Sequence, residues 1–595
     1  MLTSILCLIA AAGSHSLAAS PVFGAQERSV AVQLLDNGFF TQTDVQVTDA
    51  EGLRPVPWWR TSRGLEQIET RDGRSCLRTA PGEWAEQPLP AYAPLLGRGS
   101  IQGEVAGKGR IVLIDGRGQR HEQRFEAAQW QSLRVPLPDG FLPRLTLRLE
   151  SDGDQPAYWR GFEAQIALPC PNEEALAREI AELIDVTVTP WLERALDDSG
   201  PRNTGFVAHV IDARDGSRLM NIPGGFHPLW EQLLQAARVH ENPRWNAALQ
   251  RFLEDWLTLG LDPDTGLPRA WDPERDQPIL DRPVEIALPL SFLIDVARTG
   301  ASAKPDPFSA RARAAAIRIG ETVLRHGLLP DGSIAASYFP SDARVNTGVV
   351  SLRAFDVPAQ LARLTELTGD PRYAQAAGEA LASFEFAHSW AGTWDKIDPA
   401  FDDEYGHFGA RAVTIALAVP DDPLYRRFGT EAFAHFAPLW RDALRLGGNV
   451  AADQVRCWVL LADQQRQDST NRAAILELLS MALRSHFKGE QYGDGAWGDV
   501  TIFRFDPNSN LQVGDYSGAP MNLLHGLSAL YALPEFRTDA VRGMYTAVLR
   551  SSQTAYQRPY GFLMERRERE GANPAAGTLR MLLGLSKMLR ALRTP

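Results

Sequence analysis

The stretch from Trp390 to Arg411 contains the densest group of side chains that could carry out acid–base chemistry. Tyr405 and His407 lie two residues apart, and both side chains can exchange a proton with a substrate. Arg411 follows and could bind a carboxylate through paired N–H groups. Asp402 and Asp403 are further catalytic candidates, although they could instead be solvated caps of the next helix. The same loop offers two predicted substrate contacts, Trp394 and Glu404.

A second group of polar side chains lies between Asp331 and Arg353. Asn346 is the catalytic candidate here, because its amide could neutralise the carboxylate of a sugar. It could equally be the N-cap of a helix. The predicted substrate contacts around it are Tyr338, Arg344 and Arg353.

Two other loops supply predicted substrate contacts. From Gly489 to Ser517, glycines alternate with aromatic and acidic residues, a composition that suits a sugar-binding rim and also plain loop packing. The contacts predicted there are Tyr492, Asp494, Trp497 and Tyr516. Earlier in the chain, His227 precedes a proline and could contact substrate or cap the following helix. Arg282 and Glu285 are weaker candidates in the next loop.

A repeated helix-opening phrase indicates how these loops are positioned. It occurs at Asn242–Trp245, Asp370–Tyr373 and Asp422–Tyr425, each time with Asn or Asp before proline and an aromatic residue two positions after the proline. The Asn or Asp oxygen can accept from free N–H groups of the first turn, and proline suits the first helical position. Amphipathic runs follow from about residue 172 onward, so we expect stacked helical hairpins over 172–595.

The phrase Thr368–Tyr373, followed by AQAAGEAL, resembles the helix opener of (α/α)6 carbohydrate-active enzymes. These include six-hairpin glycosidases, unsaturated glucuronyl hydrolases and toroid polysaccharide lyases. The resemblance implies that residues 172–595 form an all-α (α/α)6 toroid and catalytic domain, with long loops gathered over its concave face. It specifies the architecture better than the chemistry, which must be argued from the site.

Residues 28–170 read as an all-β domain, because short apolar runs alternate with Gly, Pro and Asp turns. The segment Leu34–Phe40, followed by Pro57–Trp59, resembles the start of galactose-binding-like jelly rolls in secreted carbohydrate-active proteins. The expected fold is therefore multidomain, with an N-terminal jelly-roll sandwich before the toroid. Five tryptophans could stack on sugar rings or pack in the core: Trp58, Trp59, Trp84, Trp130 and Trp159.

Composition and the N-terminal segment limit the possible binding partners and cellular locations of the protein. The chain has 595 residues and a net charge of −12, which argues against nonspecific binding of nucleic acid. Residues 1–25 read as a signal peptide whose apolar run is too short to span a bilayer, so we expect a secreted or periplasmic protein without a membrane span. We expect a monomer, and the sequence suggests no cofactor and no metal site.

Three cysteines would remain after removal of the signal peptide. Cys76 and Cys170 both fall in the β domain, where they could form a disulfide in an oxidising compartment or remain two buried thiols. Cys457 lies in an apolar run beside Trp458 and is predicted to be part of the core.

The polar side chains favour a polysaccharide lyase acting on a polysaccharide or oligosaccharide that contains uronic acid. β-Elimination needs neutralisation of the carboxylate, a base for the C5 proton and an acid for the leaving oxygen. Arginine and Asn346 could do the first, while Tyr405 and His407 could do the others. The alternative is a glycoside hydrolase, including an unsaturated-uronide hydrolase, that uses an Asp/Glu pair. A second alternative is a glycan-binding protein without catalysis.

Overall fold

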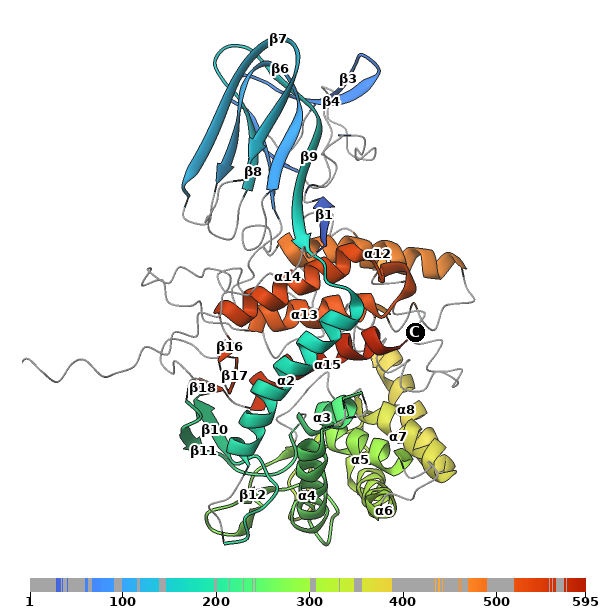
Figure 1. Cartoon of the computed structure of the whole chain (residues 1–595). Coiled ribbons are helices and arrows are strands. Elements are labelled where there is room, and N and C mark those ends of the chain that lie inside the picture. Colours follow the sequence, from blue (N-terminus) through green and yellow to red (C-terminus); the bar gives the residue numbers. More distant parts are fainter. Residues whose placement is uncertain are drawn as a thin grey trace, which may run out of the picture.

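The computed structural model shows a β-sheet region followed along the chain by a helical region (Figure 1). The predicted signal peptide, 1–25, and the loops 388–433 and 489–517 lie outside the described residues. The described residues are 28–33, 35, 40, 59–62, 67–89, 99–114, 118–137, 146–196, 201–212, 215–227, 229–237, 239–240, 242–299, 307–330, 332–346, 356–387, 434, 437–438, 441, 458–459, 462, 469–488, 518–555, 557–558, 560–562, 572–573 and 575–594.

The first region is all β, as predicted. Its strands are β1 (Ser29–Gln33), β2 (Arg60–Thr61), β3 (Gln67–Arg71), β4 (Arg74–Thr79), β5 (Trp84–Pro88), β6 (Gly99–Ile114), β7 (Arg120–Pro136), β8 (Thr146–Ser151) and β9 (Ala157–Pro169). Within the described residues they form one hydrogen-bonded network with the order β2-β5-β8-β6-β9-β4-β3. In addition, β1 pairs with β9 and β7 pairs with β6.

The long strand β6 joins two groups of strands. Its first half, Gly99–Gly107, pairs with β9, whereas its second half, Gly109–Ile114, pairs with β8. Gly107 lies at the change of partner with a φ of 84°, and a Cβ there would meet the carbonyl oxygen of Pro156. A glycine is therefore required where β6 passes from one group of strands to the other. The predicted jelly-roll connectivity stays a prediction.

Most of the described tryptophans of this region are covered by protein. Trp159 is fully buried and its indole donates to Thr79 Oγ1 at 2.9 Å, and Trp59 is also buried. Trp84 and Trp130 are half-buried, and arginine guanidinium groups lie 4.4 Å and 3.9 Å from their ring centroids. Trp58 lies outside the described residues. Core packing and arginine stacking therefore account for the described tryptophans.

Cys76 and Cys170 are free buried thiols, which is the second of the two alternatives that the sequence left open. Leu77 of β4 pairs with Trp159 of β9, so Cys76 lies near the start of β9, whereas Cys170 follows its end. Ten residues of extended strand span about 33 Å. A disulfide needs Cα atoms within about 7 Å, so these two cysteines cannot meet. Cys457 lies outside the described residues.

The region from 172 onward is predominantly helical, as predicted. Its described helices are α2 (Glu173–Ala195), α3 (Leu229–Ala237), α4 (Pro243–Leu259), α5 (Ala287–Thr299), α6 (Pro307–Thr322), α7 (Asp356–Thr368), α8 (Pro371–Ala387), α12 (Ser469–Lys488), α13 (Gly518–Tyr531), α14 (Asp539–Ala555) and α15 (Ala575–Arg593). Short strands lie between them at β10 (His209–Asp212), β11 (Arg218–Asn221), β12 (Ala270–Asp272), β13 (Gln277–Ile279), β14 (Val284–Glu285), β15 (Ser337–Tyr338), β16 (Gln557–Arg558), β17 (Gly561–Phe562) and β18 (Ala572–Asn573).

Two of the three repeated phrases open helices as predicted. Asn242 Oδ1 accepts from the N–H groups of Arg244 at 3.0 Å and Trp245 at 3.4 Å, and α4 begins at Pro243. Asp370 Oδ1 accepts from Arg372 N–H at 3.0 Å at the start of α8. The third copy, 422–425, lies outside the described residues.

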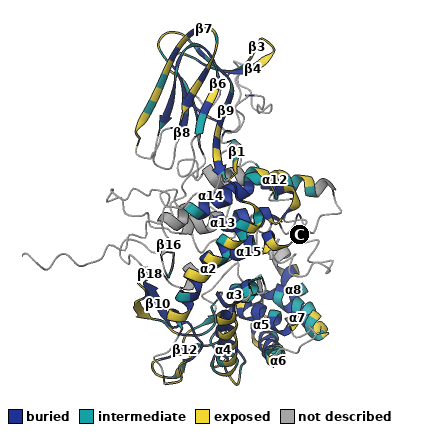
Figure 2. Ribbon diagram, in the orientation of Figure 1, coloured by how far each residue is buried: buried dark blue, intermediate teal, exposed yellow. Residues whose placement is uncertain are grey.

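The last helix returns to the first helices of the region. Helix α15 packs against α2, α3 and α13, while α5 packs against α6 and α7, and α7 against α8 (Figure 1). Figure 2 shows that α13, α14 and α15 carry mostly buried residues along their described lengths. Such a return is what closure of a ring of hairpins requires. The sixfold count of the predicted toroid depends on residues outside the described part.

The β region contacts the helical region through β1, β9 and α14. A Cβ at Gly543 of α14 would lie 2.6 Å from a methyl group of Val30, so the helix and β1 are in close contact. At the same junction, the Arg542 guanidinium donates to the carbonyl oxygen of Pro171 at 2.8 Å and to Asp539 at 2.5 Å. These contacts fix α14 against the end of β9.

Candidate functional site

The loops that precede α3 and α5 meet at one place in the structure. Gly224 and Trp271 exchange two backbone hydrogen bonds, with N–O distances of 2.7 Å and 3.0 Å. A Cβ at Gly224 would lie 2.7 Å from the side chain of Phe206, so glycine allows this close approach. The contact brings the segment before α3 against β12.

A cavity of about 550 Å³ lies between these loops. This volume falls in the range of ordinary small-molecule sites. Its lining comes from three segments that are distant in the sequence: 223–226 before α3, 268–270 beside β12, and 282–289 leading into α5. Backbone contacts between loops, rather than one continuous element, therefore form the cavity.

Phe226 gives the cavity an aromatic wall that is held from behind. Its ring centroid lies 5.2 Å from that of Trp256 on α4 and 5.5 Å from that of Phe292 on α5. Behind them, Trp230 and Phe252 stack at 4.1 Å with an interplanar angle of 8°. These partners are buried, whereas Phe226 is only partly buried. The cavity therefore presents an aromatic side chain supported by the helical core.

The charged groups of the cavity wall differ in how they are held. Arg269 donates to the carbonyl oxygen of Leu259 at 2.9 Å and lies 3.4 Å from a carboxylate oxygen of Asp262, so it braces the loop. Arg282 is exposed and makes no hydrogen bond or ion pair with any other described residue. Glu285 is also exposed and lines the same cavity. Arg282 is thus the cation of this wall that a ligand can engage.

Asn346, one of the predicted catalytic residues, lies on the same small sheet as Glu285. Glu285 of β14 pairs with Ser337 of β15. On the other side of β15, Asn346 N–H donates to Ser337 O at 2.9 Å, and its side-chain amide lies 3.4 Å from Ser337 Oγ. Glu285 and Asn346 are therefore two strand positions apart in one row, about 10 Å across the sheet.

Tyr338 is a core residue, which corrects its predicted role as a substrate contact. Its side chain is fully buried, and its hydroxyl donates to Ala335 O at 3.0 Å. Burial raises the pKa of this hydroxyl above its ordinary value. Because side chains alternate along a strand, Tyr338 points to the face opposite Ser337. Its hydroxyl also meets Gly327, where a Cβ would overlap it.

Arg344 lies in an exposed turn beside this small sheet. Its guanidinium is 4.1 Å from the Phe339 ring centroid and 3.7 Å from a carboxylate oxygen of Asp342, with 65% of the side chain exposed. It is accessible to a ligand from that surface, and the cavity lining does not include it. Its predicted contact with substrate stays a prediction.

His227 caps α3. Its Nδ1 accepts from Leu229 N–H at 3.1 Å, and its carbonyl oxygen accepts from Trp230 N–H at 3.0 Å. Burial lowers the pKa of the imidazole to about 4, so the ring is neutral at neutral pH and keeps this lone pair. Capping was one of its two predicted roles, and its side chain does not line the cavity.

The remaining predicted site residues lie outside the described residues, and their roles stay predictions. The predicted catalytic residues among them are Asp402, Asp403, Tyr405, His407 and Arg411. The predicted substrate contacts among them are Arg353, Trp394, Glu404, Tyr492, Asp494, Trp497 and Tyr516. Within the described part, no group of His, Cys, Asp and Glu is arranged to hold a metal ion. No described helix combines the length and the apolarity that a bilayer crossing would need.

The residues that line the cavity were only partly predictable from the sequence. Arg282 and Glu285 are only weak candidates on sequence grounds, and Phe226 is not among the predicted site residues. The signal that could have identified Phe226 is the double glycine before it, because Gly224 and Gly225 allow two backbones to approach beside an aromatic ring. What the sequence could not supply is the meeting of segments about 60 residues apart.

Comparisons with known proteins give likenesses of structure only. No protein-family model matches the chain, and no curated protein matches it in sequence. An α-1,2-mannosidase from Trichoderma reesei aligns with 72% of this chain and 95% of its own, at 12% identity and a TM-score of 0.47. A D-mannose isomerase aligns with 69% of this chain and 97% of its own, at 11% identity and a TM-score of 0.40.

A further likeness involves a smaller share of the chain. The N-terminal CBM22-1-CBM22-2 tandem domain from Paenibacillus barcinonensis Xyn10C aligns with 24% of this chain and 47% of its own, at 16% identity and a TM-score of 0.18. At these identities and TM-scores, none of the three likenesses assigns an activity or a substrate to this chain. The function must be argued from the cavity and its side chains.

Proposed function

We propose that this chain is a secreted or periplasmic carbohydrate-active enzyme that binds a sugar with a carboxylate group in the cavity beside α3 and α5. One observation carries the proposal: the cavity combines an aromatic wall at Phe226 with an exposed arginine, Arg282, that has no partner among the described residues. An aromatic face can pack against the C–H groups of a sugar ring, while a guanidinium matches a carboxylate in shape and charge.

The reaction we propose is β-elimination from a uronic acid. A base removes the C5 proton, the electron pair forms the C4–C5 double bond, and the glycosidic oxygen leaves with a proton from an acid. Negative charge develops on the carboxylate as the proton departs, so a guanidinium placed there lowers the barrier. We assign this neutralisation to Arg282 in the cavity wall, with Asn346 on the adjoining sheet. Tyr405 and His407 remain the proposed acid and base.

Hydrolysis is the second candidate, and Glu285 favours it. This carboxylate lines the cavity and could be one of the two acids that flank a scissile glycosidic bond. The other would come from the predicted loop residues Asp402 and Asp403. The two reactions differ in their products, because only elimination introduces a carbon–carbon double bond beside the carboxylate.

The test follows both products with uronate-containing polysaccharides as substrates. Elimination produces an ultraviolet-absorbing unsaturated end together with each new reducing end, whereas hydrolysis produces reducing ends alone. Arg282→Gln should raise KM about tenfold or more, because a hydrogen-bonded arginine–carboxylate contact contributes about 1.5–3 kcal/mol. Arg178→Gln is the matched control, since Arg178 lies on α2 with 68% of its side chain exposed and, among the described residues, pairs only with Glu174.

The outcomes separate the candidates. An ultraviolet band that grows with the reducing ends supports elimination, and reducing ends without the band support hydrolysis. Binding of the polysaccharide without any turnover would indicate a glycan-binding protein without catalysis. Equal kinetics for Arg282→Gln, Arg178→Gln and the unchanged chain would contradict the placement of the sugar in this cavity.

A further inference from the structure

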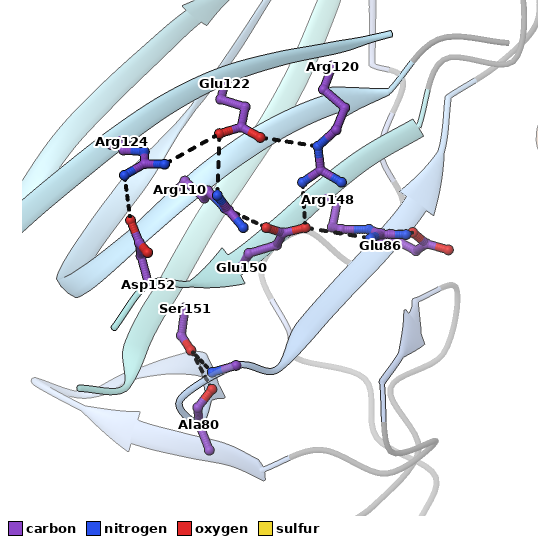
Figure 3. Close-up of polar contacts among 11 residues, drawn as sticks. Ala80, Glu86, Arg110, Arg120, Glu122, Arg124, Arg148, Glu150, Ser151 and Asp152 are labelled. Atoms are coloured by element: carbon purple, nitrogen blue, oxygen red, sulfur yellow. Dashed lines mark hydrogen bonds and ion pairs between the residues drawn. The ribbon is translucent and has the colours of Figure 1, made fainter. Parts of the chain in front are cut away.

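A second cluster of arginines lies in the β region, away from the cavity. It is carried by four neighbouring strands, β5, β8, β6 and β7, on one face of the sheet (Figure 3). We call it the arginine face and define it by Arg110, Arg120, Arg124, Arg148, Glu86, Glu122, Glu150 and Asp152. Strand pairing sets its geometry, because Arg110 lies opposite Arg124 on β7 and opposite Glu150 on β8.

Two of the four carboxylates of the arginine face, Glu150 and Glu86, lie beneath its guanidinium groups. Only 7% of the Glu150 side chain and 10% of the Glu86 side chain are exposed. By contrast, 65% of the Arg124 side chain and 37% of the Arg120 side chain are exposed. The face holds four arginines and four carboxylates, and Glu122 and Asp152 each have 28% of the side chain exposed. The two most exposed charged side chains, Arg124 and Arg120, are both cationic.

Buried Glu150 holds the arginines in place. Arg110 donates to it at 2.5 Å and Arg120 at 2.9 Å, while Arg148 lies 3.5 Å away (Figure 3). Burial would raise the pKa of Glu150, but these arginines hold it below its ordinary value. Arg148 is also fixed by stacking 4.4 Å above the Trp84 ring centroid. Guanidinium groups fixed in this way lose little conformational entropy when they bind a ligand.

Each guanidinium keeps N–H groups that the contacts above do not use. Among the described residues, Arg124 makes two ion pairs, at 3.4 Å to Asp152 and 3.9 Å to Glu122. Arg120 uses its Nε and one Nη for Glu122 and Glu150. These remaining N–H groups can therefore donate to a carboxylate from outside the protein without breaking the contacts to Glu150.

We propose that the arginine face is a binding surface for a polyuronate chain. Neighbouring guanidinium groups on paired strands can each take a carboxylate from successive sugars, and their planar shape favours carboxylate over neutral hydroxyls. The rest of the molecule is anionic, with a net charge of −12 overall, so an acidic polymer is attracted only where cations face outward. The choice of polyuronate as the ligand rests on the proposed function, whereas the site is independent of the cavity.

The experiment measures retention of the full chain in native gels that contain polygalacturonate, neutral xylan or no polymer. We expect retardation by polygalacturonate alone, and we expect it to weaken with salt because exposed charges are screened beyond about 8 Å at physiological ionic strength. Arg124→Gln should weaken the apparent affinity about threefold, and Arg120→Gln combined with Arg124→Gln about tenfold. Arg134→Gln is the control, because Arg134 lies on the same strand, ten residues from Arg124, about 33 Å along it.

The measured outcomes support or overturn this binding surface separately from the cavity. Wild-type retardation in the Arg120/Arg124 double variant, or equal retardation by xylan, would overturn it. Equal retardation by a DNA duplex would overturn selectivity for carboxylates. If the double variant unfolds, Arg124→Gln alone decides, since Arg124 makes no contact with buried Glu150. Turnover of a short uronate oligosaccharide should be unchanged in every variant, so loss of the polymer effect leaves the cavity proposal intact.

Discussion

His227 shows how one side chain can satisfy a pattern for substrate binding and still have a structural role. A histidine next to a proline in a glycine-rich loop suits either function. The structure uses its Nδ1 as an acceptor for the first turn of α3, and burial keeps it uncharged. At the same scale, Tyr338 has a residue type suited to acid catalysis but a position in the core. Residue type could be read from the sequence, but burial could not.

The cap at His227 predicts a loss of stability in mild acid. The pKa of an unfolded histidine is near 6.5, and in the folded protein it is about 4. Between these values the unfolded chain binds a proton that the folded protein does not, so the free energy of unfolding falls as the pH falls from 6.5 to 4. The loss is on the order of 3 kcal/mol at most.

The measurement is the unfolding temperature at pH 7 and pH 4.5 for the wild type and His227→Asn. Asparagine can still accept from the N–H groups of the first turn, but it does not titrate. The wild type should lose more degrees than the variant over this interval, whereas carboxylate effects are common to both. Parallel decreases in the two proteins would contradict the neutral, buried imidazole.

The starts of individual helices were the features that the sequence predicted best. Asn and Asp before proline mark the starts of α4 and α8 because an oxygen acceptor and a preset φ act within a single turn. The small sheet that places Asn346 beside Glu285 was not predictable. Its strands span two residues each, and their pairing depends on contacts between loops about 50 residues apart.

Gly107 predicts a difference between two similar substitutions. Gly107 and Gly118 have φ values of 84° and 79°, so alanine is strained at both, by about 1–2 kcal/mol. At Gly107 the new Cβ would also meet the Pro156 carbonyl oxygen, whereas no described atom lies within 4 Å of a Cβ at Gly118. We expect Gly107→Ala to cost roughly 1–3 kcal/mol more than Gly118→Ala.

Thermal unfolding of the two alanine variants tests this difference, with the change read against the wild type in the same buffer. The comparison removes the cost of the positive φ, which both positions share. Equal unfolding temperatures for the two variants would show that β6 does not need a glycine where it changes partner.

At the scale of the whole molecule, the order of an all-β region and a helical region could be predicted from periodicity alone. The return of α15 to α2 and α3 could not, because it depends on packing between segments almost 400 residues apart. The same limit explains why the sequence left two alternatives open for Cys76 and Cys170, which share a domain but lie at opposite ends of β9. Separation in space is set by strand register, which the positions of cysteines do not reveal.

The return of the last helices predicts energetic coupling between the two ends of the helical region. Arg537, just before α14, donates to both carboxylate oxygens of Glu173 at the start of α2, each at 3.0 Å. Both side chains are about one-third exposed, so we expect a coupling of about 1 kcal/mol. A double-mutant cycle with Glu173→Gln and Arg537→Gln measures it. Additive effects of the two substitutions would mean that this pair does not join the ends.

A crystal structure of the full chain with a uronate oligosaccharide would test most directly whether a carboxylated sugar binds in the cavity beside α3 and α5. We expect the sugar in the cavity lined by segments 223–226 and 282–289, with one ring against Phe226 and its carboxylate within hydrogen-bonding distance of Arg282. An oligosaccharide bound at another place in the helical region, with this cavity empty, would contradict the proposed binding of the substrate in the cavity.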